Sequence, residues 1–317
     1  MARWCACLVR MSGPDLDGVL VEGPWIHREI SANGMRFHVA EMGEGPLVLL
    51  LHGFPQFWWS MRYQLEALAH AGYRAVAPDL RGYGGSDKPP RGYDAFTLAS
   101  DVAGMIRALG ARNAVVIGHD WGGYAAWSTA VLHRPAVRAV VALAAPHPVR
   151  FRNAMVTEPR GQLQASTYLL GFQRPWLPER QLVADDAEWV GRVLHAWSGP
   201  GWPDDESERR YRAHIQIPHV AHSALEYFRW LLRSQVRPDG MRFIRNMHQA
   251  VSVPTLQLHG ALDTCVLTRT AAGSGRYVGG PYSWRMVDDV GHFLHEEAPK
   301  VVSAEIVHWL DELDHSR

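Results

Sequence analysis

Residues Gly118-His119-Asp120-Trp121-Gly122 decide how this chain folds. A short β-branched run, Ala114 to Ile117, comes before them, and an amphipathic helical pattern follows until Arg134-Pro135 ends it. A strand, a sharp turn and a helix in this order are typical of a nucleophile elbow. The two glycines have no Cβ, so neighbouring backbone can approach the strained residue that the turn presents to a substrate.

Asp120 occupies the turn position at which a serine hydrolase carries serine. A carboxylate that attacked an ester would form only a labile anhydride. One that attacks an sp3 carbon forms an alkyl ester, which water can later cleave. The aspartate therefore predicts chemistry on an epoxide or an alkyl halide. The competing interpretation is a tight connection between strand and helix with an incidental aspartate.

Length and composition indicate one large core with an insertion. The chain has 317 residues, of which 47% are hydrophobic and 20% charged. Its 32 basic and 32 acidic side chains cancel, so there is no electrostatic reason to expect a nucleic acid or an anionic membrane surface as partner. A small neutral substrate fits this balance better.

The three cysteines, Cys5, Cys7 and Cys265, are too few and too unevenly placed for a disulfide framework, which favours a reducing, cytoplasmic location. The first apolar run is too short for a signal peptide and is interrupted by Arg10. No stretch reaches the roughly 18 apolar residues of a membrane span. We expect residues 1–24 to form a loose tail.

Strand and helix patterns alternate through most of the chain, which predicts an α/β fold with a mostly parallel sheet and helices on both faces. Between Pro148 and about Met247 the alternation stops, and the sequence becomes rich in Trp, Arg and Pro with helical stretches. We therefore predict a core at 25–146 and 248–317 and an inserted helical cap at 147–247. The expected strands are 35–42, 47–51, 73–77, 114–117, 137–143, 254–258 and 282–287, and the expected helices outside the cap are 64–71, 98–109, 121–133 and 299–313.

Three residues able to do acid-base and nucleophilic chemistry follow predicted strands in the order nucleophile, acid, histidine: Asp120, Asp263 and His292. This is the chain order of the α/β-hydrolase triad. An imidazole held by a carboxylate keeps the right tautomer and can take a proton from water. Asp263 could instead be a turn former, and His292 could be an ordinary core or surface residue among 17 histidines.

His52-Gly53-Phe54-Pro55 directly follows the predicted strand Leu47 to Leu51. This architecture places an oxyanion loop there, whose backbone N–H acts together with that of the residue after the nucleophile. We assign the two donors to Phe54 and Trp121. Taken alone, the tetrapeptide is also compatible with a plain Gly-Pro turn at the end of a strand.

With these motifs in place, the chain resembles an α/β-hydrolase-fold epoxide hydrolase over nearly its full length, apart from the N-terminal tail. The matching stretches are His52 to Gln64, Pro78 to Ser86, the elbow, and Gly291 to Glu297. Within the second stretch, the resemblance implies a structural rather than a catalytic role for Asp79.

The resemblance also implies two cap tyrosines whose phenols bind the epoxide oxygen and protonate it as the ring opens. Tyr168 lies where the first is expected. The second departs from the family pattern, since Phe228 stands directly before Arg229 and the tyrosine is Tyr227. Consecutive helix positions differ by about 100°, so Tyr227 either replaces the missing phenol in a rotated helix or leaves Tyr168 to act alone. Ordinary cap packing is the other interpretation of both tyrosines.

The expected reaction is hydrolysis of an epoxide to a vicinal diol through a covalent alkyl-aspartate ester, with no metal or organic cofactor. Trp58, Trp59 and Trp121 near the site favour a small apolar or aromatic epoxide, with water as co-substrate. Whether the chain forms a homo-oligomer is left open.

Two other functions compete with this one. A haloalkane dehalogenase shares the triad but typically carries asparagine where Phe54 stands, and phenylalanine offers no side-chain donor to a halide. Trp121 could still supply one half of a halide clamp. A ligand-binding protein without catalysis is the third alternative, because a fold does not fix a function.

Overall fold

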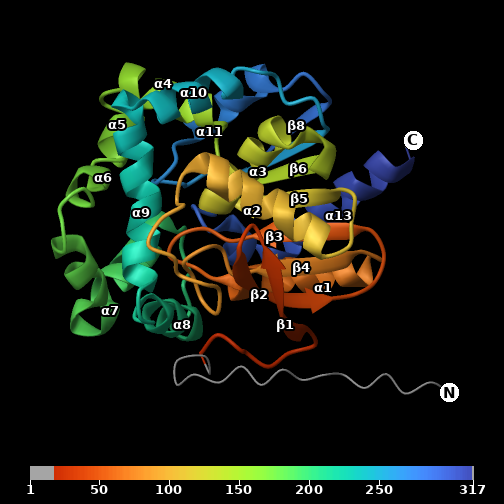
Figure 1. The fold of residues 1–317 in the computed structure, drawn as a ribbon, viewed down its shortest axis with the longest axis horizontal. Helices are drawn as coiled ribbons and strands as arrows, with labels where there is room; N and C mark the ends of the chain where they lie inside the picture. The colour runs from red at the N-terminus through yellow and green to blue at the C-terminus, as the bar shows by residue number, and fades with distance from the viewer. Residues whose placement is uncertain (1–17, 316–317) are drawn as a thin grey trace.

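An eight-stranded sheet runs through the computed structural model, which describes residues 18–315 (Figure 1). Its order is β1-β2-β4-β3-β5-β6-β7-β8, and every pairing is parallel except β1 with β2 and β2 with β4. The strands are β1 Ile26–Ala32, β2 Met35–Met42, β3 Leu47–Leu51, β4 Arg74–Pro78, β5 Ala114–His119, β6 Val137–Leu143, β7 Thr255–Gly260 and β8 Tyr282–Val287. The mostly parallel sheet expected from the sequence is confirmed.

The central strands are buried along their length because both faces of the sheet are covered. All residues of β3, β5 and β7 are buried, whereas β1 at the edge buries only two of its seven residues. In the register of β3 and β5, Leu51 pairs with Gly118. The two strands therefore end side by side, and the loops that follow them meet at one edge of the sheet.

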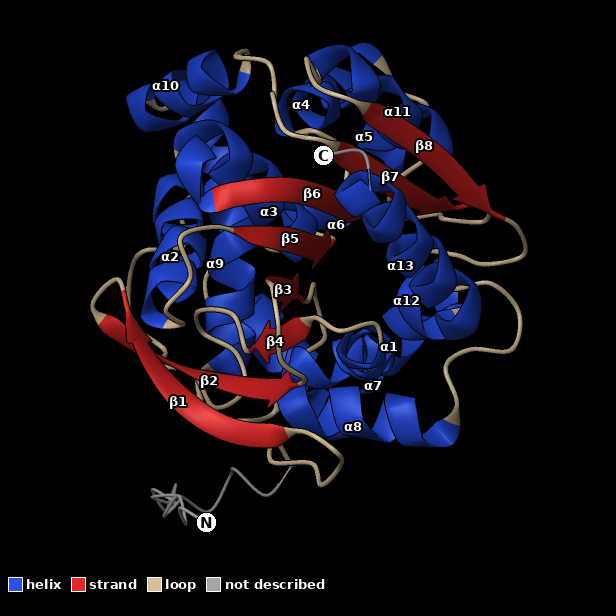
Figure 2. Cartoon of the chain, turned by 90° about the vertical axis from the view of Figure 1, so that its right-hand side faces the viewer, coloured by secondary structure: helices blue, strands red, loops and turns tan. Residues whose placement is uncertain are grey.

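Helices cover both faces of the sheet, with α2 and α3 on one side and α1, α12 and α13 on the other (Figure 2). The predicted helix near Leu98 begins three residues earlier, because the Asp94 side chain accepts hydrogen bonds from the N–H groups of Phe96 and Thr97 and so caps α2. The α-helices outside the insertion are α1 Arg62–His70, α2 Ala95–Ala108, α3 Trp121–Leu132, α11 Thr268–Ala272, α12 Leu294–Glu297 and α13 Pro299–His315.

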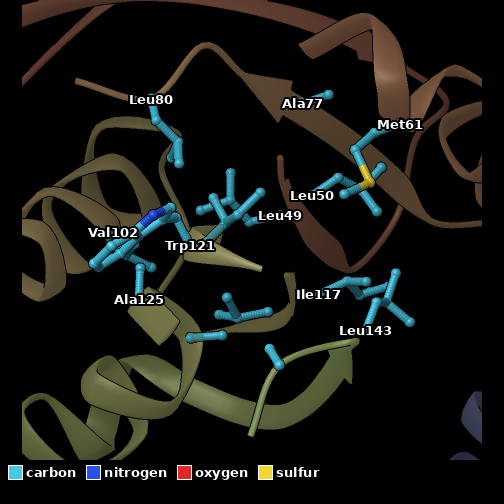
Figure 3. Close-up of a cluster of buried hydrophobic side chains, with 14 of the residues drawn as sticks. Leu49, Leu50, Met61, Ala77, Leu80, Val102, Ile117, Trp121, Ala125 and Leu143 are labelled. Carbon is cyan, nitrogen blue, oxygen red and sulfur yellow. The ribbon is translucent and has the colours of Figure 1, made fainter. Parts of the chain in front are cut away.

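Successive side chains of a central strand enter the two layers of the core. Figure 3 shows Leu49 pointing toward Val102 and Ala125, and Leu50 pointing toward Met61. All five of these side chains are 2% exposed or less. The alternation is that of a strand, whose neighbouring residues face opposite sides of the sheet.

A helical insertion separates β6 from β7, as the sequence predicts, and lies beside the sheet in Figure 1. The helix α7 is interrupted at Ala184 to Ala187, where the backbone angles are not helical. The exact limits of core and cap stay a prediction. The insertion contains α4 Pro148–Thr157, α5 Gln162–Ala165, α6 Tyr168–Gly171, α7 Leu177–Trp197, α8 Asp205–Ile215, α9 Val220–Arg233 and α10 Pro238–Met247.

Most of the segment predicted to be a loose tail lies outside the described residues. Of the part that is described, Val19 is fully buried, and its carbonyl accepts a hydrogen bond of 2.8 Å from Trp58 Nε1. This hydrogen bond holds Val19 against the core. Among the described residues, we find no helix with the length and apolar character needed to cross a membrane.

Candidate active site

Asp120 lies at the sharp turn between β5 and α3, with φ +47° and ψ −112°. These angles are unusual for a residue with a side chain and mark a strained turn. The turn requires the flanking glycines: a Cβ at Gly122 would lie 2.1 Å from the Leu51 carbonyl oxygen, and one at Gly118 would lie 2.2 Å from the Gly122 carbonyl oxygen. The strand-turn-helix geometry expected from the sequence is present.

The Asp120 carboxylate faces two backbone donors. Oδ2 accepts a hydrogen bond of 3.0 Å from Phe54 N–H, and the Trp121 N–H also stabilises the ionised carboxylate. Gly53 allows this approach, because a Cβ there would lie 2.6 Å from the Asp120 Cβ. With Oδ2 in this cradle, Oδ1 is the oxygen left for attack on a substrate.

His292 joins the other two predicted residues. Its Nδ1 lies 2.8 Å from Asp263 Oδ2, and its Nε2 lies 4.0 Å from Asp120 Oδ1. The second Asp263 oxygen, Oδ1, accepts hydrogen bonds from Cys265 N–H and Val266 N–H. Asp263 can therefore hold the tautomer that carries its proton on Nδ1. Nε2, which makes no hydrogen bond within the described part of the chain, is left as the basic nitrogen.

Burial and charge act against each other at both titrating partners. Burial disfavours the imidazolium of His292, yet the charge and hydrogen bond of Asp263 and the charge of Asp120 outweigh it and raise its pKa. Burial also raises the pKa of Asp120, and His292 and the two backbone N–H groups counteract part of that increase. A desolvated carboxylate of this kind is a stronger nucleophile than one surrounded by water.

The loop that carries His292 is held by residues to which the sequence analysis gave no role. His119 Nε2 lies 2.9 Å from the His292 carbonyl oxygen, and Trp197 O accepts from His292 N–H at 2.8 Å. The Glu297 carboxylate accepts three backbone N–H groups, those of Gly199, Gly291 and Phe293. His119 and Glu297 both lie inside the sequence motifs, but only the fold shows what they contact.

A cavity opens above Asp120, between α3 and the cap. It holds about 500 Å³ of empty space, part of it open to solvent. Trp58 and Trp59, which were expected near the site, do not line it. Its lining is Asp120, Trp121, Tyr124, Ala145, Pro146, Phe151, Tyr168, Leu169, Phe228, Leu231, Cys265 and Val266.

The structure separates the two candidate cap tyrosines. Tyr168 lines the cavity with its hydroxyl 3.7 Å from Cys265 Sγ, and burial, together with Cys265 and Asp120, raises its pKa. Tyr227 is fully buried and points away, donating a hydrogen bond of 2.7 Å to the Arg81 carbonyl. Phe228, rather than Tyr227, lines the cavity. The suggestion that Tyr227 supplies the missing phenol is therefore corrected: its hydroxyl is bonded outside the cavity.

Phe54 and Trp121 are the two residues considered for a halide clamp. Phe54 provides a ring that packs edge-on against Phe228, with 5.1 Å between the ring centroids. Trp121 Nε1 is fully buried and finds no partner among residues 18–315.

Asp79, which the resemblance marked as structural, lies outside the cavity lining. Its carboxylate accepts from Trp58 N–H and Gly85 N–H and lies 2.8 Å from His38 Nδ1. These contacts, together with the charges of nearby histidines, outweigh burial and hold its pKa well below the usual range. The carboxylate fixes the loop after β4 against the loop after β3.

Comparison with known proteins places this geometry in context. A model of the alpha/beta hydrolase fold family matches residues 46–299. Epoxide hydrolase 3 of Xenopus tropicalis is 34% identical over 291 residues, covering 88% of this chain and 76% of that protein. Epoxide hydrolase A of Mycobacterium tuberculosis is 31% identical over 314 residues, covering 90% and 98%. The crystal structure of Epoxide Hydrolase A from Mycobacterium thermoresistibile superposes with a TM-score of 0.79 at 29% identity, covering 90% of this chain and 98% of that one.

Proposed function

We propose that this chain, which belongs to the epoxide hydrolases of the α/β-hydrolase fold, converts its epoxide to a vicinal diol in two steps through an ester on Asp120. Epoxide hydrolysis follows from the family. The covalent route and the residue roles are our proposal, and they rest on one observation above all. His292 lies between the two carboxylates: its Nδ1 is within hydrogen-bond distance of Asp263, and its Nε2 lies near the Asp120 carboxylate.

In the first step, Asp120 Oδ1 attacks an epoxide carbon from the side opposite the ring oxygen. The C–O bond of the ring breaks, and its electron pair stays on oxygen, which takes a proton from the Tyr168 hydroxyl. Tyr168 is the phenol supported for this role, because it shares the cavity with Asp120. The product of the step is a hydroxyalkyl ester of Asp120.

In the second step, His292 Nε2 removes a proton from water, which attacks the Cγ carbon of the ester. The oxyanion that develops lies where Oδ2 now accepts from Phe54 N–H, within the cradle completed by Trp121 N–H. The tetrahedral intermediate then collapses: the bond from Cγ to the alkyl oxygen breaks, the imidazolium gives its proton to that oxygen, and the diol leaves. The proton left on the Asp120 carboxyl group returns through solvent to Tyr168. Asp263 stabilises the imidazolium formed during this step.

The cavity wall also supports a substrate class. Apart from Asp120, the lining side chains are apolar, aromatic, phenolic or thiol groups, and none is basic. Such a wall stabilises a substituent by burying its apolar surface and gives no partner to an anionic one. We therefore propose a small apolar or aromatic epoxide as substrate.

Replacing the base should separate the two steps. His292→Gln leaves Asp120 able to form the ester but removes the group that activates water, so the ester should accumulate. Intact-mass spectrometry after mixing the variant with an aryl epoxide should show protein carrying one substrate mass. His308→Gln, a change at an exposed histidine on α13, should show no adduct at steady state. An unmodified His292→Gln protein that still produces diol would contradict the proposed role.

A further inference from the structure

We infer that Tyr124 is a specificity-determining residue, whose hydroxyl donates a hydrogen bond to an uncharged acceptor on the substituent of the epoxide. The inference deepens the proposed function and rests on it. It concerns the end of the cavity away from the reacting carbon. The acceptor would be the oxygen of a carbonyl group on that substituent.

Tyr124 reaches the cavity from the helix that begins at the nucleophile. It lies one helical turn after Asp120, and its N–H donates to the Asp120 carbonyl at 2.8 Å. Its ring packs against Trp121 and Phe243, with centroid separations of 5.3 and 5.8 Å. These contacts fix the ring in the wall. The spacing of four residues from Asp120 is the sequence signal that could have identified it, because such residues share a helix face.

The hydroxyl of Tyr124 makes no hydrogen bond to any other described residue. The two cap tyrosines differ: the Tyr168 hydroxyl is within reach of Cys265, and Tyr227 donates to the Arg81 carbonyl. A buried or half-buried tyrosine hydroxyl usually has a partner. On a wall that is otherwise mostly apolar, this phenol is therefore a donor available to a ligand.

The surroundings of the Tyr124 and Tyr168 hydroxyls differ in charge. Burial alone raises the pKa of Tyr124, whereas the charge of Asp120 is among the causes that raise the pKa of Tyr168. We therefore assign the proton transfer to Tyr168 and a contact with the substituent to Tyr124, which lines the same cavity.

The charge of the site decides what kind of group would be recognised. Among the described residues that line the cavity, Asp120 is the one that carries a charge, and none is Lys, Arg or His. An anionic substituent would be repelled by Asp120 without a compensating cation. A phenol is a better donor than acceptor, because its oxygen lone pair is delocalised into the ring. A neutral acceptor is thus the matching chemistry.

Two probes of nearly equal shape test this inference: 4-acetylphenyl glycidyl ether, which carries a carbonyl, and 4-isopropylphenyl glycidyl ether, which does not. In each, the oxirane is insulated from the ring substituent. We expect Tyr124→Phe to lower kcat/KM for the acetyl probe about two- to tenfold, the range for one neutral hydrogen bond. The isopropyl probe should be unaffected. Tyr227→Phe, which removes a phenol bonded outside the cavity, should leave the ratio between the probes unchanged.

The outcomes distinguish failure of this inference from failure of the proposed epoxide hydrolase function. Loss of the acetyl preference in Tyr124→Phe alone supports the inference. An unchanged ratio, or an equal decrease for both probes, overturns it and leaves the epoxide hydrolase mechanism standing. If the unsubstituted protein forms diol from neither these probes nor any other epoxide, the proposed function fails, and the inference fails with it.

Discussion

At the scale of single residues, the site depends on one strained backbone position and on the space that the neighbouring glycines leave for it. Asp120 holds a positive φ, and glycines on both sides leave room for the turn. These features can be predicted from sequence, because only glycine lacks the Cβ that would collide with the facing carbonyls. The triad follows from chain order in the same way, and the structure brings its three members together.

The choice between Tyr227 and Phe228 could not be made from sequence. The two positions differ by about 100° around α9, and packing of α9 against the core decides which one faces the cavity. The structure gives Tyr227 a hydrogen bond to Arg81 and places Phe228 on the wall. The helix rotation is a property of the folded protein, which local patterns do not contain.

The two tyrosines should respond differently to loss of the hydroxyl. Tyr168→Phe removes the proposed acid and should slow ester formation roughly ten- to a hundredfold, for a cost of about 1 to 3 kcal/mol in the barrier. Tyr227→Phe should keep the wild-type rate but lower the free energy of unfolding by about 1 kcal/mol, since the Arg81 carbonyl loses its donor. Stopped-flow measurement of ester formation and urea unfolding check both. An unchanged rate in Tyr168→Phe would remove it from the mechanism.

At the scale of elements, the limits of several strands could be predicted from the sequence. Those of β2, β3, β6 and β8 match the expected ones, whereas β5 and β7 each continue two residues further than expected. The exposed strand β1 was not predicted as such, because a strand with few buried residues has a weak pattern. Helix starts were displaced where a side chain caps the helix, as Asp94 does for α2.

The loop after β7 should set the pH dependence of the second step. His292 must be neutral to accept a proton, and its pKa is raised above 6.5. In the ester Asp120 carries no charge, so its contribution to this increase is lost while that of Asp263 remains. Ester hydrolysis should therefore fall as the pH decreases through the pKa of His292. Asp263→Asn removes the principal cause of the increase and leaves burial, which acts in the opposite direction, so the midpoint should move to lower pH.

Single-turnover decay of the ester, followed across pH in the parent protein and in Asp263→Asn, measures this shift. The variant should also be slower at every pH, because the imidazole loses its orienting partner. A midpoint that stays in place in Asp263→Asn would show that another group controls the titration.

At the scale of the whole molecule, a buried carboxylate connects the cap to the core. Glu296 accepts hydrogen bonds from Tyr211 of the cap helix α8, from Arg62 of α1 and from Gln56. The Arg62 side chain is only 9% exposed, so its charge depends on this partner. This cluster of hydrogen bonds around Glu296 lies beside the loop that carries His292, and it fixes the position of the cap over the cavity.

Glu296→Gln should destabilise the protein by about 3 to 5 kcal/mol, because it leaves the buried Arg62 charge without its opposite charge. Urea unfolding provides the measurement. Glu305→Gln is the matched control, since Glu305 is 42% exposed and 3.9 Å from Arg285, and such a surface pair contributes about 1 kcal/mol or less. If the two changes lowered the free energy of unfolding equally, the buried cluster around Glu296 would contribute no more to stability than a surface ion pair.

The central claim is that the Asp120 carboxylate becomes alkylated and that water then regenerates it. One turnover in oxygen-18 water, with protein in excess over the epoxide, tests it most directly. The account predicts that the heavy oxygen appears in the peptide containing Asp120, while the first diol carries none, because its second oxygen comes from the carboxylate. Heavy oxygen in the diol and none at Asp120 would mean that water attacks the epoxide itself, which contradicts the account.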